Sequence, residues 1–322
     1  MLARILGRHS DILAFPELHF VEELWEPALP QTPARAELVA RLLQNSDNRY
    51  FDPLDATNYI PAAKELLGRL PPEAGPCQVL EEVIAQAVSK AGKRIGCEQT
   101  PKNVYYLRDL LDRFPSSVAI NIVRDPRDVV YSQKDWWRRV FRQYSFPWRG
   151  IPWIVTLRRW AQYHPLVTAK LWRGGVEAGE QESRNPRVIS IRFEDLIVRP
   201  EPTLAPLMAL LGIEFQDEML RIAGNNSSHS RPGARSAGLD PAASGNWRQG
   251  LTRAELWFVE RQTFPLAEQY GYVSASRSFP FITVPLLLAL LPLKVGTALL
   301  LRVGSPRRFY SSVKLRFFSG RR

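Results

Sequence analysis

The chain alternates short, β-branched apolar runs with longer segments in which apolar residues recur every three or four positions. The short runs are typical of strands buried on both faces, and the longer period is typical of helices with one buried face. Strands are predicted over Lys93–Cys97, Ser117–Val123 and Arg187–Phe193, with a further short strand at the beginning of Ile12–Trp25. Helices are predicted over Met1–Arg8, Arg35–Leu43, Ile60–Leu70, Val79–Ala91, Tyr105–Phe114, Thr203–Leu211 and Thr252–Tyr270. This alternation predicts an α/β fold with a parallel sheet.

The composition narrows the class of protein and its partners. A chain of 322 residues with 45% hydrophobic content can bury a large core, in one α/β domain or in two smaller ones. A net charge of +11 indicates an anionic partner, such as a nucleotide, an anionic lipid or an acidic glycan. We expect no nucleic-acid partner, because no zinc-finger, RNP-type or helix-turn-helix signature is found. Cys77 and Cys97 cannot form a disulfide framework, so a reducing compartment such as the cytoplasm is expected.

The strongest candidate site is the segment 121–133, Asn-Ile-Val-Arg-Asp-Pro-Arg-Asp-Val-Val-Tyr-Ser-Gln. A buried strand ends here at charged residues around a proline, and a helix begins. Ligands of open α/β sheets bind at the carboxyl ends of the strands, where Arg124 and Ser132 could face one phosphate. In the alternative interpretation, Arg124, Asp125, Arg127 and Asp128 form a solvated salt-bridge cluster at the start of the helix. The pattern alone leaves both interpretations open.

Residues 123–132 resemble the 3′-phosphate-binding motif of sulfotransferases, enzymes that use 3′-phosphoadenosine 5′-phosphosulfate (PAPS) as sulfuryl donor. Three further segments are similar to family motifs, in the family's order. Residues 98–102 resemble a Glu-Lys-Thr-Pro-Lys segment, residues 192–196 an Arg-Tyr-Glu-Asp-Leu segment, and residues 245–249 a Gly-Asp-Trp-Lys-Asn segment. The resemblance extends over residues 1–272, which are expected to form the sulfotransferase-like domain.

The resemblance implies site residues as well as a fold. The nucleotide would be bound by Lys102, Arg124, Ser132, Arg231, Arg235, Trp247 and Arg248. Glu17 stands where tyrosyl-protein and bacterial members place a catalytic carboxylate, and His19 is the rival base. The alternatives are that Glu17 caps a helix and that Lys102 is a surface lysine. No metal is implied, and a nucleotide kinase is disfavoured because the chain has no Gly-x-x-x-x-Gly-Lys-Ser/Thr loop.

The family's first strand and its 5′-phosphosulfate loop have no counterpart in the sequence, which begins where the following helix should run. Either the start codon is assigned too far downstream, which we favour, or the chain is a shortened homologue. The fold expected from the resemblance is a P-loop NTPase-like parallel sheet flanked by helices and lacking that strand. The expected function is sulfuryl transfer from PAPS to a hydroxyl or amine acceptor, with a glycan or a lipid among the candidates. The alternative is a catalytically inactive, membrane-associated homologue with a binding or scaffold role.

Residues 273–322 form a different kind of segment. Phe279–Leu301 is apolar apart from Lys294 and a few small polar groups, and it is interrupted by Pro285 and Pro292. The residues that follow are strongly basic. We therefore expect a tail at an anionic membrane surface, either as a spanning helix or, as we favour, as an interfacial hairpin broken at the prolines. The protein would then be peripheral or anchored through its C-terminus; the alternative is a terminal helix packed on the domain.

Overall fold

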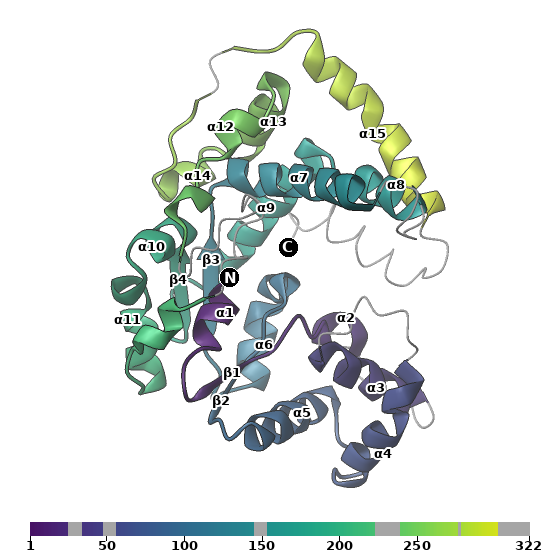
Figure 1. The fold of residues 1–322 in the computed structure, drawn as a ribbon, viewed down its shortest axis with the longest axis vertical. Helices are drawn as coiled ribbons and strands as arrows, with labels where there is room; N and C mark the ends of the chain where they lie inside the picture. The colour runs from purple at the N-terminus through teal and green to yellow at the C-terminus, as the bar shows by residue number, and fades with distance from the viewer. Residues whose placement is uncertain (25–33, 48–55, 145–152, 223–238, 276–277, 302–322) are drawn as a thin grey trace.

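Four short strands form two parallel pairs at the centre of the computed structural model (Figure 1). β1 (Ile12–Ala14) pairs with β2 (Ile95–Cys97), and β3 (Ala119–Val123) pairs with β4 (Val188–Arg192). The structure describes residues 1–24, 34–47, 56–144, 153–222, 239–275 and 278–301, and the statements that follow concern these ranges. Parallel strands flanked by helices confirm the predicted α/β class. Within the described ranges, however, the strands form two sheets of two rather than one continuous sheet.

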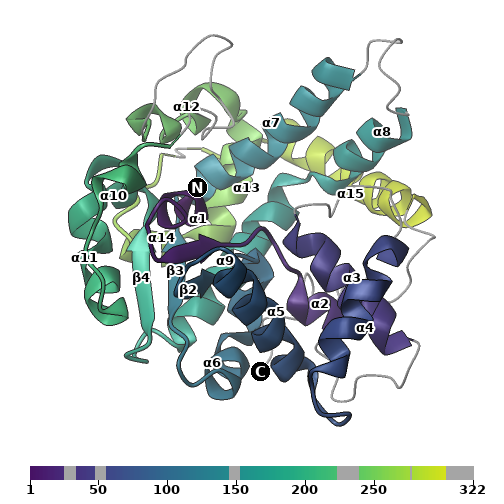
Figure 2. The same ribbon diagram turned by 60° about the horizontal axis from the view of Figure 1, so that its bottom comes forward.

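Helices surround the strand pairs on both sides. In Figures 1 and 2, α2 to α5 gather on one side of the strands, and α10 and α11 lie on the other. The helices are α1 (Leu2–Leu6), α2 (Phe20–Leu24), α3 (Ala34–Ser46), α4 (Ile60–Gly68), α5 (Pro76–Lys90), α6 (Leu107–Arg113), α7 (Pro126–Tyr144), α8 (Trp153–Gln162), α9 (Pro165–Gln181), α10 (Phe193–Val198), α11 (Pro200–Leu211), α12 (Trp247–Gly250), α13 (Arg253–Thr263), α14 (Leu266–Gln269) and α15 (Thr283–Leu300). A 3₁₀ helix, η2 (Pro101–Tyr106), precedes α6.

The first helix joins the two strand pairs through its apolar face. Ile5 and Leu6 of α1 are fully buried in a cluster that contains Ile12 of β1 and Ile191 of β4. Side chains of β2 and β3 pack against the same cluster. Both pairs therefore share one core, and burial of these apolar side chains away from water holds the pairs together.

Helix boundaries follow local signals where the sequence carries them. Thr252 caps α13, because its hydroxyl accepts from the Glu255 backbone N–H and the Glu255 carboxylate accepts from the Thr252 backbone N–H. The predicted helix Thr252–Tyr270 divides into α13 and α14, because Pro265 supplies no N–H for a continuous helix. Gly212 ends α11 with a φ of 64°, the left-handed conformation that glycine adopts at little cost.

The C-terminal apolar run is one helix, α15, so the prediction of a hairpin broken at the prolines is wrong. Pro285 lies in the first turn, where its missing N–H leaves no hydrogen bond unmade, and Pro292 is accommodated inside the helix. One side of α15 packs on α8 and α13, with Val284 buried beside Phe258. In the described part of the chain, no helix has the combined length and apolar character needed to cross a bilayer.

Candidate active site

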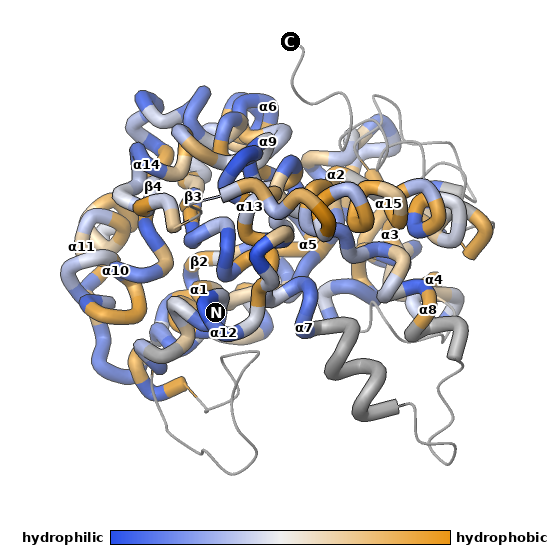
Figure 3. The backbone as a smooth tube through the Cα atoms, turned by 90° about the horizontal axis from the view of Figure 1, so that it is seen from above, coloured by the Kyte–Doolittle hydropathy of each residue, from blue (hydrophilic) through white to orange (hydrophobic). Residues whose placement is uncertain are grey.

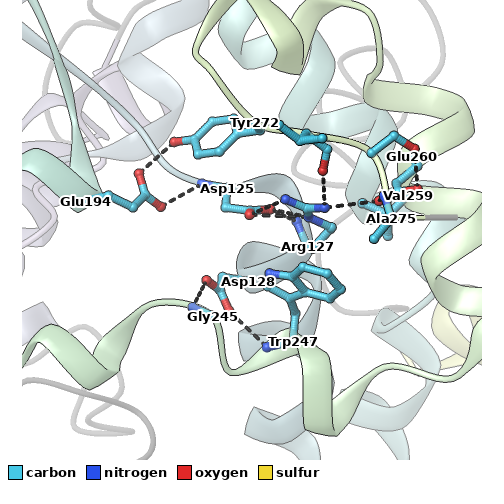
Figure 4. Close-up of polar contacts among 12 residues, drawn as sticks. Asp125, Arg127, Asp128, Glu194, Gly245, Trp247, Val259, Glu260, Tyr272 and Ala275 are labelled. Carbon is cyan, nitrogen blue, oxygen red and sulfur yellow. Dashed lines mark hydrogen bonds and ion pairs between the residues drawn. The ribbon is translucent and has the colours of Figure 1, made fainter.

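A buried arginine, Arg127, fixes the loop between β3 and α7 (Figure 4). Its guanidinium donates to the Asp125 carboxylate, from Nε at 2.9 Å and from Nη2 at 2.7 Å. Nη1 donates to Glu260 Oε1 at 3.1 Å and to the Val273 carbonyl at 2.8 Å. The loop is thereby tied to α13 and to the chain beyond α14. Of the predicted solvated salt-bridge cluster, only Arg127 and Asp125 form an ion pair in the described ranges, and it is buried rather than solvated, since Asp125 and Arg127 are 6% and 4% exposed.

Asp128 attaches the Gly245–Trp247 segment to the first turn of α7. Its Oδ2 accepts from the Gly245 N–H at 2.6 Å, and its Oδ1 accepts from the Trp247 N–H at 3.0 Å. Gly245 has a φ of 81°, which a residue with a Cβ rarely adopts. The guanidinium groups of Arg127 and Arg248 lie 4.1 Å and 4.7 Å from the centre of the Trp247 ring. Burial raises the pKa of Asp128, and the two backbone donors and Arg124 offset part of that rise.

Arg124 follows the last residue of β3 and reaches the same segment. Its Nη2 donates to the Ala243 carbonyl at 2.7 Å, and its guanidinium lies 4.4 Å from the centre of the Phe193 ring. Its own carbonyl accepts from Trp172 Nε1 at 2.8 Å. The Arg124 Nε atom is buried and has no hydrogen-bond partner in the described part of the structure. Ser132, the other expected 3′-phosphate ligand, is half-buried in the second turn of α7.

A cavity of about 350 Å³ opens beside these residues. Its wall consists of Asp125, Arg127, Arg192, Glu194, Ser244, Gly245, Trp247, Arg248, Gly271, Tyr272, Val273 and Ala275. Glu194 is already engaged, because its carboxylate accepts from the Asp125 N–H at 3.1 Å and from the Tyr272 hydroxyl at 2.6 Å. Arg192 Nε, by contrast, is buried without a hydrogen-bond partner in the described ranges. Arg124 and Ser132 are not in the wall, although the Ala243 acceptor of Arg124 directly precedes Ser244.

The two candidate bases lie together in the turn after β1. Glu17 Oε2 is 3.4 Å from His19 Nε2, and the side chains are 45% and 11% exposed. His19 has a φ of 55°, the left-handed conformation that is uncommon for a non-glycine residue. A carboxylate that is open to solvent beside an imidazole can take a proton from an attacking hydroxyl. The two candidate bases therefore form one pair, and the proton could pass to either of them.

A half-buried carboxylate holds the backbone of this turn in place. Glu98, which follows β2, accepts from the Leu18 N–H at 3.2 Å and from Asn103 Nδ2 at 2.5 Å. It also accepts from the Thr100 hydroxyl, whose oxygen accepts from the His19 N–H at 3.2 Å. Burial raises the pKa of Glu98, while these donors and His19 favour its charged form. Lys102 lies two residues beyond Thr100, half-buried in η2.

The structure gathers the expected site residues into two groups. Arg124, Trp247 and Arg248 belong to the group around the β3–α7 loop, and Glu17 and His19 form the other. Arg231 and Arg235 lie outside the described residues. Sequence patterns did not indicate the roles of Asp128, Arg192 and Glu98. Asp128 accepts from Gly245 and Trp247, and Glu98 accepts from Leu18, so these contacts join segments that are far apart in the sequence.

No group of three or more histidine, cysteine, aspartate or glutamate side chains in the described ranges is arranged to hold a metal ion. Cys77 and Cys97, both half-buried, are free thiols. Burial raises the pKa of the Cys97 thiol to about 11, which makes it unreactive near neutral pH.

Comparisons with known proteins show what this chain is similar to. It is 25% identical over 270 residues to nodulation protein NoeE of Sinorhizobium fredii, an alignment that covers 80% of this chain and 59% of NoeE. The chain thus spans about three fifths of the length of that relative. A sulfotransferase domain from the curacin biosynthetic pathway matches with a TM-score of 0.49 and 19% identity, over 85% of this chain and 93% of that domain. The sulfotransferase domain of the Synechococcus PCC 7002 olefin synthase matches with a TM-score of 0.48 and 18% identity, over 84% of this chain and 90% of that domain.

The comparison with family models gives the assignment. The model of the sulfotransferase family matches residues 1–217, which is about two thirds of the chain. The matched part contains Glu17, His19 and Arg124, and the Gly245–Arg248 segment lies beyond it. The chain therefore belongs to the sulfotransferase family, whose members are transferases.

Proposed function

We propose that this protein transfers a sulfuryl group from PAPS to a hydroxyl or amine acceptor, through a domain formed by residues 1–272. The observation that carries the proposal is the Nε of Arg124, in the loop between β3 and α7, which is buried and has no hydrogen-bond partner in the described ranges. A buried donor without an acceptor is costly, and an oxyanion beside it would satisfy that donor. The proposal assigns this position to the 3′-phosphate of the nucleotide.

Three features of the site favour a phosphate at Arg124. A guanidinium presents donors in a fork that matches phosphate oxygens. The first turn of α7, which is 19 residues long, adds the positive end of the helix dipole. Ser132 on the same helix supplies the expected hydroxyl.

The other proposed nucleotide-binding residues are four cations and one aromatic residue. The cations are Lys102, Arg231, Arg235 and Arg248, and Trp247 supplies an aromatic wall.

The turn after β1 would supply the base. In the proposed step, the acceptor oxygen or nitrogen attacks sulfur, and the bond between sulfur and the bridging phosphate oxygen of PAPS breaks. 3′-Phosphoadenosine 5′-phosphate leaves with that electron pair, and the acceptor proton passes to the Glu17 carboxylate or to His19. Glu98 acts as a positioning residue, because it holds the backbone of Leu18 and, through Thr100, that of His19.

The acceptor is proposed only as a chemical class. The exposure of Glu17 leaves room for a hydroxyl or amine at its carboxylate. A glycan or a lipid are the acceptor types that we would test first, by offering labelled PAPS to polysaccharide and membrane fractions.

Calorimetric titration with 3′-phosphoadenosine 5′-phosphate tests the nucleotide site directly. Arg124→Ala should weaken binding by about ten- to a hundredfold, since a charged hydrogen-bonded contact contributes about 1.5–3 kcal/mol. Arg173→Ala is the matched control, because Arg173 is an exposed arginine on α9 paired only four residues away with Glu177. Unchanged affinity in Arg124→Ala would refute the assignment. Tight binding without transfer to any acceptor would instead support the inactive homologue.

A further inference from the structure

α15 presents its apolar residues outward and its charged residue inward. Surface helices of globular proteins normally do the reverse, with charged side chains facing water. Leu286, Leu293 and Leu300, spaced seven residues apart, are 61%, 58% and 76% exposed. Phe281 and Ile282, just before the helix, are 79% and 84% exposed. Figure 3 shows this helix as a largely hydrophobic band at the surface of the molecule.

The opposite side of α15 is fixed to the domain by polar contacts. Lys294, 7% exposed, donates from Nζ to the carbonyls of Trp160, at 3.1 Å, and Tyr163, at 2.7 Å. Its ammonium lies 4.4 Å from the centre of the Trp160 ring. A ring nitrogen of His164 is 3.1 Å from the Leu287 carbonyl. The helix is thus held lengthwise against the domain, with the leucine stripe facing away from it.

The charge of the adjoining sequence indicates what covers this stripe. No aspartate or glutamate follows Glu268. The residues after the helix contain seven basic side chains, namely Arg302, Arg307, Arg308, Lys314, Arg316, Arg321 and Arg322. An apolar face joined to a cationic segment is complementary to a bilayer surface with anionic headgroups. A second copy of the chain would supply the same net positive charge rather than the opposite one.

We propose that the exposed face of α15 docks in the plane of an anionic membrane. Phe281, Ile282, Leu286, Leu293 and Leu300 would enter the boundary between headgroups and acyl chains, and the following basic residues would attract anionic lipids. This proposal is independent of the sulfuryl transfer proposed above, because none of these residues belongs to either group of site residues.

Vesicle flotation of the full chain tests the proposal. The wild type should bind vesicles of phosphatidylcholine mixed with phosphatidylserine much better than vesicles of phosphatidylcholine alone, and high salt should weaken this binding. The triple variant Leu286→Gln, Leu293→Gln, Leu300→Gln should bind the anionic vesicles at least about tenfold more weakly, because each leucine loses its apolar contact with lipid. Val198→Gln with Leu210→Gln is the matched control, since both residues are exposed apolar side chains elsewhere.

Two further measurements keep the test decisive. Amide hydrogen exchange of wild-type residues 283–301 should slow when anionic vesicles are added, which requires no variant. Size-exclusion chromatography shows whether the leucine stripe joins two copies. Failure of the wild type to bind anionic vesicles, equal binding by the triple variant, or conversion of a dimer to a monomer by the triple substitution would each overturn the proposal.

Discussion

At the scale of single residues, the buried Arg127 holds the β3–α7 loop in position. Its guanidinium contacts two carboxylates, one carbonyl and the faces of two aromatic rings, those of Trp247 and Phe264. A buried charge is tolerable only when it is paired, so each partner depends on the others. The position of Arg124 in turn depends on this loop, which makes Arg127 a structural support of the proposed phosphate site.

Arg127→Met should lower the free energy of unfolding by about 3–5 kcal/mol, because it leaves the carboxylates of Asp125 and Glu260 buried without their cation. Urea denaturation monitored by fluorescence measures this loss. Arg173→Met, which removes an exposed ion pair, should change stability by less than about 1 kcal/mol. A loss of similar size in both variants would show that the buried cluster is not a major source of stability.

Single residues also show how far sequence reasoning reached. The capping role of Thr252 was predictable because its partner, Glu255, is three residues away. The contact of Asp128 with Gly245 and Trp247 spans more than a hundred residues and depends on the tertiary fold. Resemblance to the family identified Trp247 and Arg248 as nucleotide-binding candidates, but gave no indication that Asp128 holds their segment.

At the scale of elements, α12 approaches α7 so closely that a glycine is required between them. A Cβ atom on Gly250 would lie 1.8 Å from Cε2 of Tyr131. The Gly250 carbonyl accepts from Lys134 Nζ at 2.9 Å, which joins the same two helices. Because α12 carries Trp247 and Arg248, this contact fixes one side of the cavity.

Gly250→Ala should lower the free energy of unfolding by about 1–3 kcal/mol, since the tyrosine ring must move to admit the methyl group. The cost should be smaller in a Tyr131→Ala background, and chemical denaturation of the four proteins measures the coupling. Gly296→Ala is the control, because no atom lies within 4 Å of the added methyl group and the helix should gain up to about 1 kcal/mol. Equal costs in both backgrounds would argue against the contact.

The strands were predictable because β-branched apolar runs carry a strong local signal. β2, β3 and β4 each lie inside the predicted range, within two residues of its limits. The proline rule failed in α15 because tertiary contacts with α8 and α13 support a helix that local preference would interrupt. The division of the strands into two pairs was not predictable from periodicity, which contains no information on which strands pair.

At the scale of the whole molecule, Lys294 links the stability of the fold to pH. Burial lowers its pKa to about 8, although Glu255 nearby partly favours the charged form. In the unfolded chain Lys294 has the ordinary lysine pKa of 10.5, so between pH 8 and pH 10.5 the unfolded chain binds more protons at this residue than the folded chain does. The contribution of Lys294 to the free energy of unfolding should therefore rise with pH between pH 8 and pH 10.5, by at most about 1.4 kcal/mol per pH unit.

Urea denaturation at about pH 7.5 and about pH 9.5 checks this expectation when the wild type is compared with Lys294→Met. The variant has no titrating group at this position, so its stability should rise less than that of the wild type between the two conditions. Tyr270 and Tyr272, whose pKa values are raised by burial, affect both proteins equally. A parallel change in the two proteins would show that Lys294 does not titrate in this range.

The central claim is that Arg124 binds the 3′-phosphate of the donor nucleotide, and one thermodynamic cycle tests it most directly. Calorimetry would compare 3′-phosphoadenosine 5′-phosphate with adenosine 5′-phosphate, each binding to the wild type and to Arg124→Ala. Removal of the 3′-phosphate should weaken binding to the wild type by at least about tenfold and should change binding to the variant little. An equal loss in both proteins would contradict the account, because the arginine and the phosphate would then act independently.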